Sequence, residues 1–185
     1  MQLLKGDTPL LKIGSGLAFI LGLFHLYTST FGVLEAFLHR GIHLTGMLVV
    51  IFLTQPVVKD RKKYGPVLKI LDLILILLVI TVGLYQILQS NTLLLRAGNP
   101  STADIYLCIL LILLVLEGTR RTIGLALSLV CIVFLLYTYL GPYLPPFIGH
   151  AGYSVREIAD IQFLGTHGLF GMPLGVMATY IIIFV

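Results

Sequence analysis

Two of the five histidines have a spacing that could bind a metal ion. His39 and His43 are four residues apart, which on a helix places two imidazoles on one face. However, Arg40 and Gly41 lie between them, and this stretch has the composition of a short turn outside a membrane span. No carboxylate follows at a useful spacing. We therefore interpret the pair as interfacial polar residues at a helix start, and expect no metal site.

His25 lies inside an apolar run, where ionisable side chains are uncommon and often functional. A haem held by two histidines would require a second histidine at similar depth on another span. His43 is expected at the outer edge of the next span, and His150 and His167 outside the membrane. We instead expect His25 to bond to a neighbouring helix near Tyr27 or Thr28.

Charged residues gather near one end of a later apolar run. Glu117 is followed by Arg120 and Arg121, at the i, i+3 and i, i+4 spacings that allow ion pairs on a helix. We predict a cytoplasmic ion-pair cluster there. Asp72 and Asp104 also border apolar runs, where a charge costs little and indicates little about function.

The sequence contains no pattern typical of an enzyme. It has no nucleophile–base pair, no phosphate-binding loop and no CxxC motif. Its two cysteines, Cys108 and Cys131, lie in separate apolar runs and predict neither a disulfide framework nor a metal site. We expect no catalytic residue, no metal and no cofactor.

A glycine-rich segment, GTHGLFGMPLG, spans Gly165 to Gly175. Gly168, Gly171, Pro173 and Gly175 are candidates for a structural or gating role. The GxxxG spacing from Gly171 to Gly175 allows close helix approach, while glycine and proline together weaken helical continuity, as in the broken helices of transporters. A broken helix beside a substrate path and a glycine-rich helix start packed against the preceding span both remain open.

Membrane helices must position these residues. Apolar residues make up 58% of the 185 residues and charged residues 11%, against about 45–50% and about 25% in soluble domains, and mean hydropathy is +1.03. We predict an all-α integral membrane protein, a multi-span helical bundle, because each span must satisfy its own backbone hydrogen bonds. Five complete spans are expected at 13–32, 42–58, 68–88, 103–117 and 123–140, with a truncated sixth from Gly168.

Loop charge predicts an orientation for these spans. Nine of the 12 basic residues fall on one side of the alternating chain and three, Arg40, Arg96 and Arg156, on the other. The positive-inside rule therefore predicts a cytoplasmic N-terminus. Between the fifth and sixth spans, Ser154 is placed as the N-cap of a short amphipathic helix at the outer surface; an ordinary connecting helix packed on the bundle is the alternative.

The run from Gly118 to Val176 resembles the junction region of fused TRAP-transporter permeases, the type with four plus twelve spans that works with TAXI-type binding proteins. The pieces that carry the resemblance are RRTIG (120–124), FLLYTYLGPYLP (134–145) and GLFGMPLGV (168–176), with looser matches in FHLYTS (24–29) and HLTGMLVVIFLTQP (43–56). His167 stands where the family often has an acidic residue, so no role is carried onto it.

The resemblance implies a secondary transporter in a bacterial or archaeal cytoplasmic membrane, driven by an ion gradient in which sodium is the expected coupling ion. A periplasmic TAXI-type solute-binding protein would deliver a solute, often an organic acid. Residues 1–119 would form the four-helix region similar to the small subunit, and residues 120–185 would begin the large-subunit transport domain. Substrate and ion sites would lie beyond Val185.

Two readings compete with transport. The chain could be a small membrane anchor of a redox complex that holds haem or quinone through histidines, or a structural membrane subunit without a ligand. Because the final 18 residues, from Gly168, run to the end without a charge or a closing flank, we expect the chain to be the front part of a longer permease whose remainder is a further partner.

Overall fold

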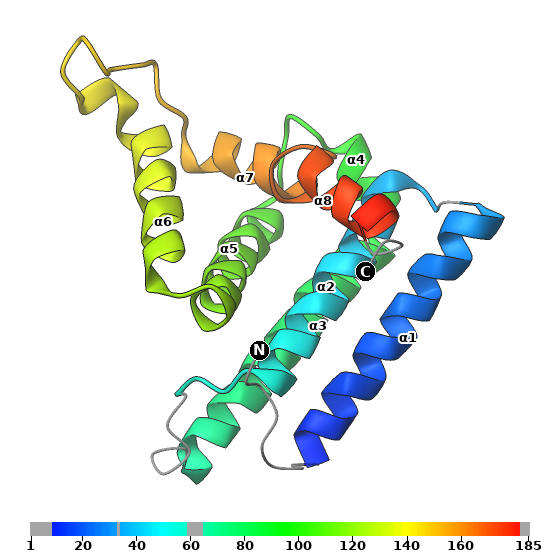
Figure 1. Ribbon diagram of the computed structural model, residues 1–185. Coiled ribbons are helices and arrows are strands. Elements are labelled where there is room, and N and C mark those ends of the chain that lie inside the picture. The colour runs from blue at the N-terminus through cyan, green and yellow to red at the C-terminus, as the bar shows by residue number, and fades with distance from the viewer. Residues whose placement is uncertain (1–8, 33, 59–64, 182–185) are drawn as a thin grey trace.

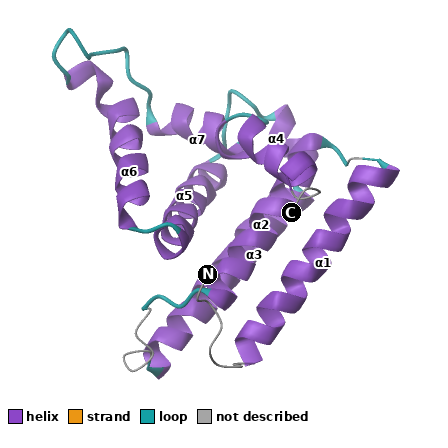
Figure 2. Cartoon of the chain, viewed as in Figure 1, coloured by secondary structure: helices purple, strands orange, loops and turns teal. Residues whose placement is uncertain are grey.

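The computed structural model describes residues 9–32, 34–58 and 65–181, and its regular elements are all helical (Figure 2). In chain order the α-helices are α1 (Pro9–Phe31), α2 (Ala36–Thr54), α3 (Pro66–Leu88), α4 (Ser90–Leu95), α5 (Thr102–Thr122), α6 (Leu125–Leu140), α7 (Val155–Phe163) and α8 (Met172–Val176). Short 3-10 helices, η1 (Gly141–Tyr143) and η2 (Gly168–Phe170), and a π-helical turn, η3 (Met177–Ile181), complete the chain.

Five of these helices are long and apolar enough to cross a membrane: α1, α2, α3, α5 and α6 together with η1. Many of their large apolar side chains are exposed, among them Phe19, Ile70 and Phe134, as expected for helices that face lipid. The all-α, multi-span prediction is confirmed. The basic residues expected at Lys5, Lys59 and 61–63 lie outside the described residues.

The helices alternate in direction, which places their charged ends in two groups. Lys69, Arg120 and Arg121 lie where α2 ends and α3 begins, a side called here the basic end. Arg40, Arg96 and Arg156 lie at the opposite side, called the α7 end because α7 and α8 lie across it (Figure 1). This grouping agrees with the alternation predicted from loop charge; which end is cytoplasmic stays a prediction.

α2 is the centre of the packing, with α1 and α3 along its length and α5 and α8 also in contact. Small residues allow α2 and α3 to approach closely. A Cβ on Gly83 would lie 2.3 Å from Thr45 Cγ2, and Gly41 lies against the Gln86 amide, which donates to the Phe37 carbonyl at 3.1 Å. The largest buried side chains include Phe37, Phe163 and Phe170 at the α7 end, and the core continues along the bundle to Phe52 near the basic end.

α6 packs mainly on α5 and leaves most of its surface exposed (Figure 1). The turn between them depends on Gly124, whose φ of +122° favours glycine. The Ser128 hydroxyl, the one buried side chain of α6, donates to the Leu116 carbonyl at 3.1 Å. α5 and α6 therefore form a hairpin that joins the bundle through α5.

α7 is the amphipathic helix predicted after Ser154. Ser154 accepts from the Glu157 amide at 3.3 Å, and the Glu157 carboxylate accepts from the Ser154 amide at 2.7 Å, which together form a capping box. Ala159 and Phe163 are its buried face. Asp160 accepts from the Gly98 amide at 2.7 Å, so α7 packs on the bundle as a connecting helix.

Replacing Gly83 with alanine should loosen the α2–α3 contact. The new Cβ would meet the Thr45 Cβ at 2.9 Å as well as its methyl, so a backbone must shift. We expect a loss of about 1–3 kcal/mol in unfolding free energy, measured by denaturation in detergent micelles. Gly22→Ala on α1, where nothing lies within 4 Å, is the control; equal effects of both substitutions would contradict the packing argument.

The capping box of α7 should respond to acid. Hydrogen bonds from the Ser154 amide and hydroxyl lower the pKa of Glu157. The cap is therefore complete above the ordinary glutamate pKa of about 4.3 and is lost as pH falls below it through the lowered value. Hydrogen exchange at the Ser154 amide, which donates to that carboxylate, should accelerate relative to intrinsic rates over that range. Glu157→Gln keeps the capping geometry without a titration, so acid loss in that variant would contradict the assignment.

Candidate functional site

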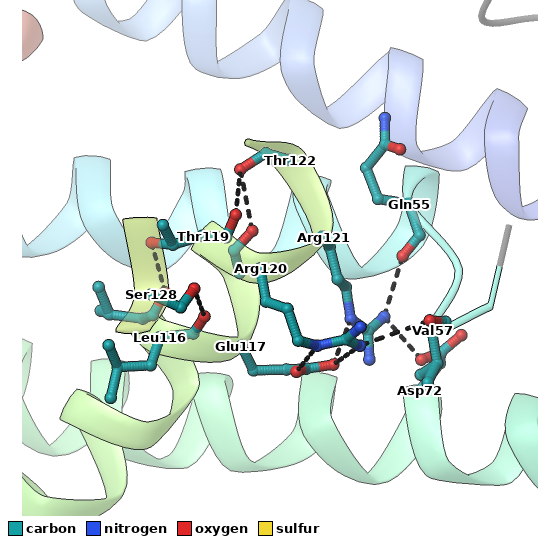
Figure 3. Close-up of polar contacts among 12 residues, drawn as sticks. Gln55, Val57, Asp72, Leu116, Glu117, Thr119, Arg120, Arg121, Thr122 and Ser128 are labelled. Atoms are coloured by element: carbon teal, nitrogen blue, oxygen red, sulfur yellow. Dashed lines mark hydrogen bonds and ion pairs between the residues drawn. The ribbon is translucent and has the colours of Figure 1, made fainter. Parts of the chain in front are cut away.

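A cluster of charges at the basic end joins three helices (Figure 3). Arg121, at the end of α5, donates from Nη1 to Asp72 of α3 at 2.7 Å and to the Gln55 carbonyl after α2 at 2.9 Å. Its Nε donates to Glu117 at 2.8 Å. Arg120 donates to the same carboxylate at 2.7 and 2.8 Å. The predicted pairs of Glu117 with Arg120 and Arg121 are confirmed, and they extend into a larger network.

The pair of Arg121 with Asp72 is almost wholly removed from solvent, with side chains 0% and 6% exposed. The guanidinium also lies over the Phe52 ring, 4.7 Å from its centroid, a cation–π geometry. By contrast, Arg120 and Glu117 are 35% and 25% exposed. Removing one member of a buried pair leaves an uncompensated charge. Arg121 is therefore the member of the cluster that holds α2, α3 and α5 together.

Asp72 was interpreted from sequence as an interfacial charge that indicates little, and this was wrong. Its partner is buried with it. Asp104 was interpreted in the same way and is also buried, accepting from the Tyr85 hydroxyl at 2.7 Å and from Arg96 at 3.3 Å. The available signal was that a carboxylate and an arginine were expected at the same end of neighbouring spans.

Three histidines meet between α1 and α2 near the α7 end. His25 Nδ1 lies 3.1 Å from His39 Nε2, and His25 Nε2 lies 2.9 Å from His43 Nδ1. All three side chains are buried. This group, the histidine chain, corrects the expectation that His39 and His43 flank an external turn: both lie within α2, which begins at Ala36. His25 does bond to a neighbouring helix, and its partners are these histidines.

The geometry of the histidine chain differs from that of a metal site. Because His25 directs one ring nitrogen at each neighbour, no three nitrogens converge on a common point. Among the described residues, no group of three or more His, Cys, Asp or Glu side chains is arranged to hold a metal ion. The chain can instead pass hydrogen bonds from ring to ring.

The glycine-rich segment forms a succession of short helical pieces at the α7 end, called here the broken helix. η2, α8 and η3 follow one another from Gly168 to Ile181 and contact α2. Gly168 has a φ of +49°, and a Cβ on it would lie 2.5 Å from the Ile161 carbonyl oxygen. Arg40 donates to the Phe170 and Thr166 carbonyls at 2.7 and 3.4 Å, and so satisfies backbone groups that the break leaves without helical partners.

The candidate residues Gly171, Pro173 and Gly175 lie in or next to α8. Gly171 is the N-cap of α8 and Pro173 lies in its first turn. A Cβ on Gly175 would lie 2.7 Å from Arg40 Nε, so Gly175 gives the guanidinium room to reach the broken segment. The structure brings these residues to Arg40 and the start of α2, and does not bring them to Glu117, Arg120 or Arg121 at the basic end. His150 and His167 lie apart from the histidine chain.

Comparisons with protein-family models, with curated proteins and with solved structures found no match to this chain.

Removing Asp72 should cost far more stability than removing Arg120. Asp72→Ala leaves the Arg121 guanidinium buried beside an empty position, which should lower the unfolding free energy by about 3–5 kcal/mol. Arg120→Ala removes a partly exposed partner and should cost about 1 kcal/mol or less. Thermal denaturation of both variants in the same detergent gives the comparison.

A double substitution, Asp72→Leu with Arg121→Met, removes both buried charges. It should be less destabilising than Asp72→Ala, because no uncompensated charge remains. If Asp72→Ala were no more harmful than Arg120→Ala, the central role of the buried pair would be rejected.

Proposed function

We propose that this chain is a membrane permease component of a TRAP-type secondary transporter that takes up an organic acid delivered by a periplasmic binding protein and is driven by an ion gradient. In this proposal the chain supplies the bracing helices and the first part of the transport domain. The sequence resemblance from Gly118 to Val176 is its starting point. The broken helix from Gly168 to Ile181 is the structural observation that carries it.

A broken helix supports a permease for a physical reason. Inside a membrane, an interruption of a helix exposes backbone groups that lipid cannot satisfy. Such breaks therefore occur where the backbone lies within protein or lines a polar path, as in transporters. Here Arg40 binds carbonyls at the break, and Gly175 leaves room for it.

A bracing role for the remaining helices is supported by their packing. Arg121 ties α2, α3 and α5 together at the basic end. Close contacts at Gly41 and Gly83 hold α2 against α3 towards the other end. Helices joined at both ends suit a frame against which a transport domain moves. These contacts favour a rigid arrangement of α2, α3 and α5.

A second function, the membrane anchor of a redox complex, is favoured by one observation: His25 lies at the depth of two histidines on another helix. Two axial ligands of a haem must stand on opposite faces of the macrocycle. Here the His25 ring instead lies within hydrogen-bonding distance of both His39 and His43, which leaves no gap for a macrocycle between the two helices at this point. Transport is therefore the preferred proposal.

Uptake measurements can separate these functions. We expect deletion of the gene in its source organism to abolish uptake of at least one radiolabelled carboxylate, and the restored gene to recover it. In spheroplasts washed free of periplasmic proteins, uptake should cease and return when the periplasmic extract is added. Imposed sodium and proton gradients, applied separately, identify the coupling ion.

The deletion strain can also show that the permease proposal is wrong. Unchanged uptake of every carboxylate in a broad panel after deletion would reject the permease proposal. A Soret band in the visible spectrum of the purified protein would favour the redox anchor instead.

A further inference from the structure

The histidine chain has no role in the bracing or the helix break, yet all three of its side chains are buried near the α7 end. His25, His39 and His43 are 1%, 2% and 5% exposed. Six residues separate His25 from the end of α1, a depth of about 9 Å along the helix. Burying three imidazoles in a membrane bundle is costly unless each is hydrogen-bonded, so their mutual contacts require an explanation.

Thr28 determines the direction of the hydrogen bonds. Its hydroxyl donates to the His25 carbonyl at 3.1 Å, so its oxygen must accept in its 3.3 Å contact with His39 Nε2. With that proton arrangement His39 Nε2 carries the hydrogen, and its single N–H is shared between the Thr28 oxygen and His25 Nδ1. Because a neutral imidazole has one N–H, His25 donates from Nε2 to His43 Nδ1. The bonds then run from His39 through His25 to His43.

We propose that His39, His25 and His43 form a site that binds one excess proton and passes it along the chain. A proton that joins His39 Nδ1 makes His39 an imidazolium, whose Nε2 proton moves to His25 Nδ1. His25 then transfers its Nε2 proton to His43 Nδ1, and His43 releases a proton from Nε2. Only N–H bonds form and break, one proton enters and one leaves, and every ring ends in its other tautomer.

One excess proton is the capacity of this site because two imidazolium rings in contact would repel each other strongly. With the proton on His25, both of its N–H groups donate, to His39 Nε2 and His43 Nδ1, so the charge is bonded on both sides. After release, His39 Nε2 carries no proton, so it can no longer donate to the Thr28 hydroxyl.

The other ionisable groups near the site set its electrostatics. On α2, Arg40 adds positive charge next to His39, while the Glu35 carboxylate caps the amides of Phe37 and Leu38 at 2.9 Å. Tyr27 on α1 and Tyr180 on η3 are both more than half exposed. The residues of α8 and η2 carry no ionisable side chain. None of these neighbouring groups is a buried carboxylate that would hold the proton permanently.

Nitrogen NMR of the full chain in lipid nanodiscs tests this proposal. A His150→Gln, His167→Gln background leaves only the three histidines of the chain. With ¹⁵N-labelled histidine, we expect couplings across both N–H···N contacts and one transition on acidification in which all three rings shift together with uptake of one proton. Three independent titrations, or the absence of both couplings, would overturn the proposal.

Thr28→Val, which keeps the side-chain shape, tests the direction. We expect the coupled transition to remain and the His39 ring to change from a single tautomer to a mixture. Thr30→Val is the control, because the Thr30 hydroxyl donates to the Leu26 carbonyl at 2.8 Å and contacts no histidine. An unchanged His39 tautomer in Thr28→Val would overturn the role of Thr28. The NMR couplings, the titration and the His39 tautomer are measured without transport, so their outcome is independent of the outcome of the uptake experiment.

Discussion

The arrangement of the bundle depends on one buried guanidinium. Arg121 contacts Asp72, Glu117 and the Gln55 carbonyl at once, and no two of these three groups belong to the same helix or its immediate extension. A charge in this position has a large desolvation cost, which is offset only when the helices that carry its partners are in register. This cost disfavours other packings of α2, α3 and α5, since a shift of one turn would separate Arg121 from Asp72 and the Gln55 carbonyl and leave it only Glu117 of its own helix.

At the opposite end, contacts between polar side chains and backbone groups accompany the ion pair of Arg96 with Asp104. There the chain turns from α6 through α7 into the broken helix, and polar side chains bind main-chain atoms: Arg40 at the Phe170 carbonyl, Asp160 at the Gly98 amide and Ser154 at the start of α7. In a membrane protein such bonds let irregular backbone lie close to the apolar core. The two ends thus solve the same problem, unsatisfied polar groups, with different chemistry.

The sequence was most informative where one local rule dominates. Long apolar runs predicted the five spans, the Glu117–Arg121 spacing predicted the ion pairs, and Ser154 followed by Glu157 predicted α7. The start of α2 was missed because Glu35, His39 and Arg40 have the composition of a loop. In the structure Glu35 caps the helix, Arg40 binds carbonyls from a segment 126 and 130 residues away, and His39 pairs across to α1. The Glu35 cap is local, but the contacts of His39 and Arg40 are tertiary and no local pattern encodes them, and the histidine chain was missed for the same reason.

The positions of these two polar layers determine how much of the bundle is electrically insulating. Along α2, 12 residues separate His43 from Gln55, which at about 1.5 Å each is a distance of about 18 Å. The hydrocarbon core of a bilayer is about 30 Å thick. Where water reaches both polar layers, a transmembrane voltage would fall mainly across the thinner apolar slab between them, and the field inside this protein would exceed the field in the surrounding lipid.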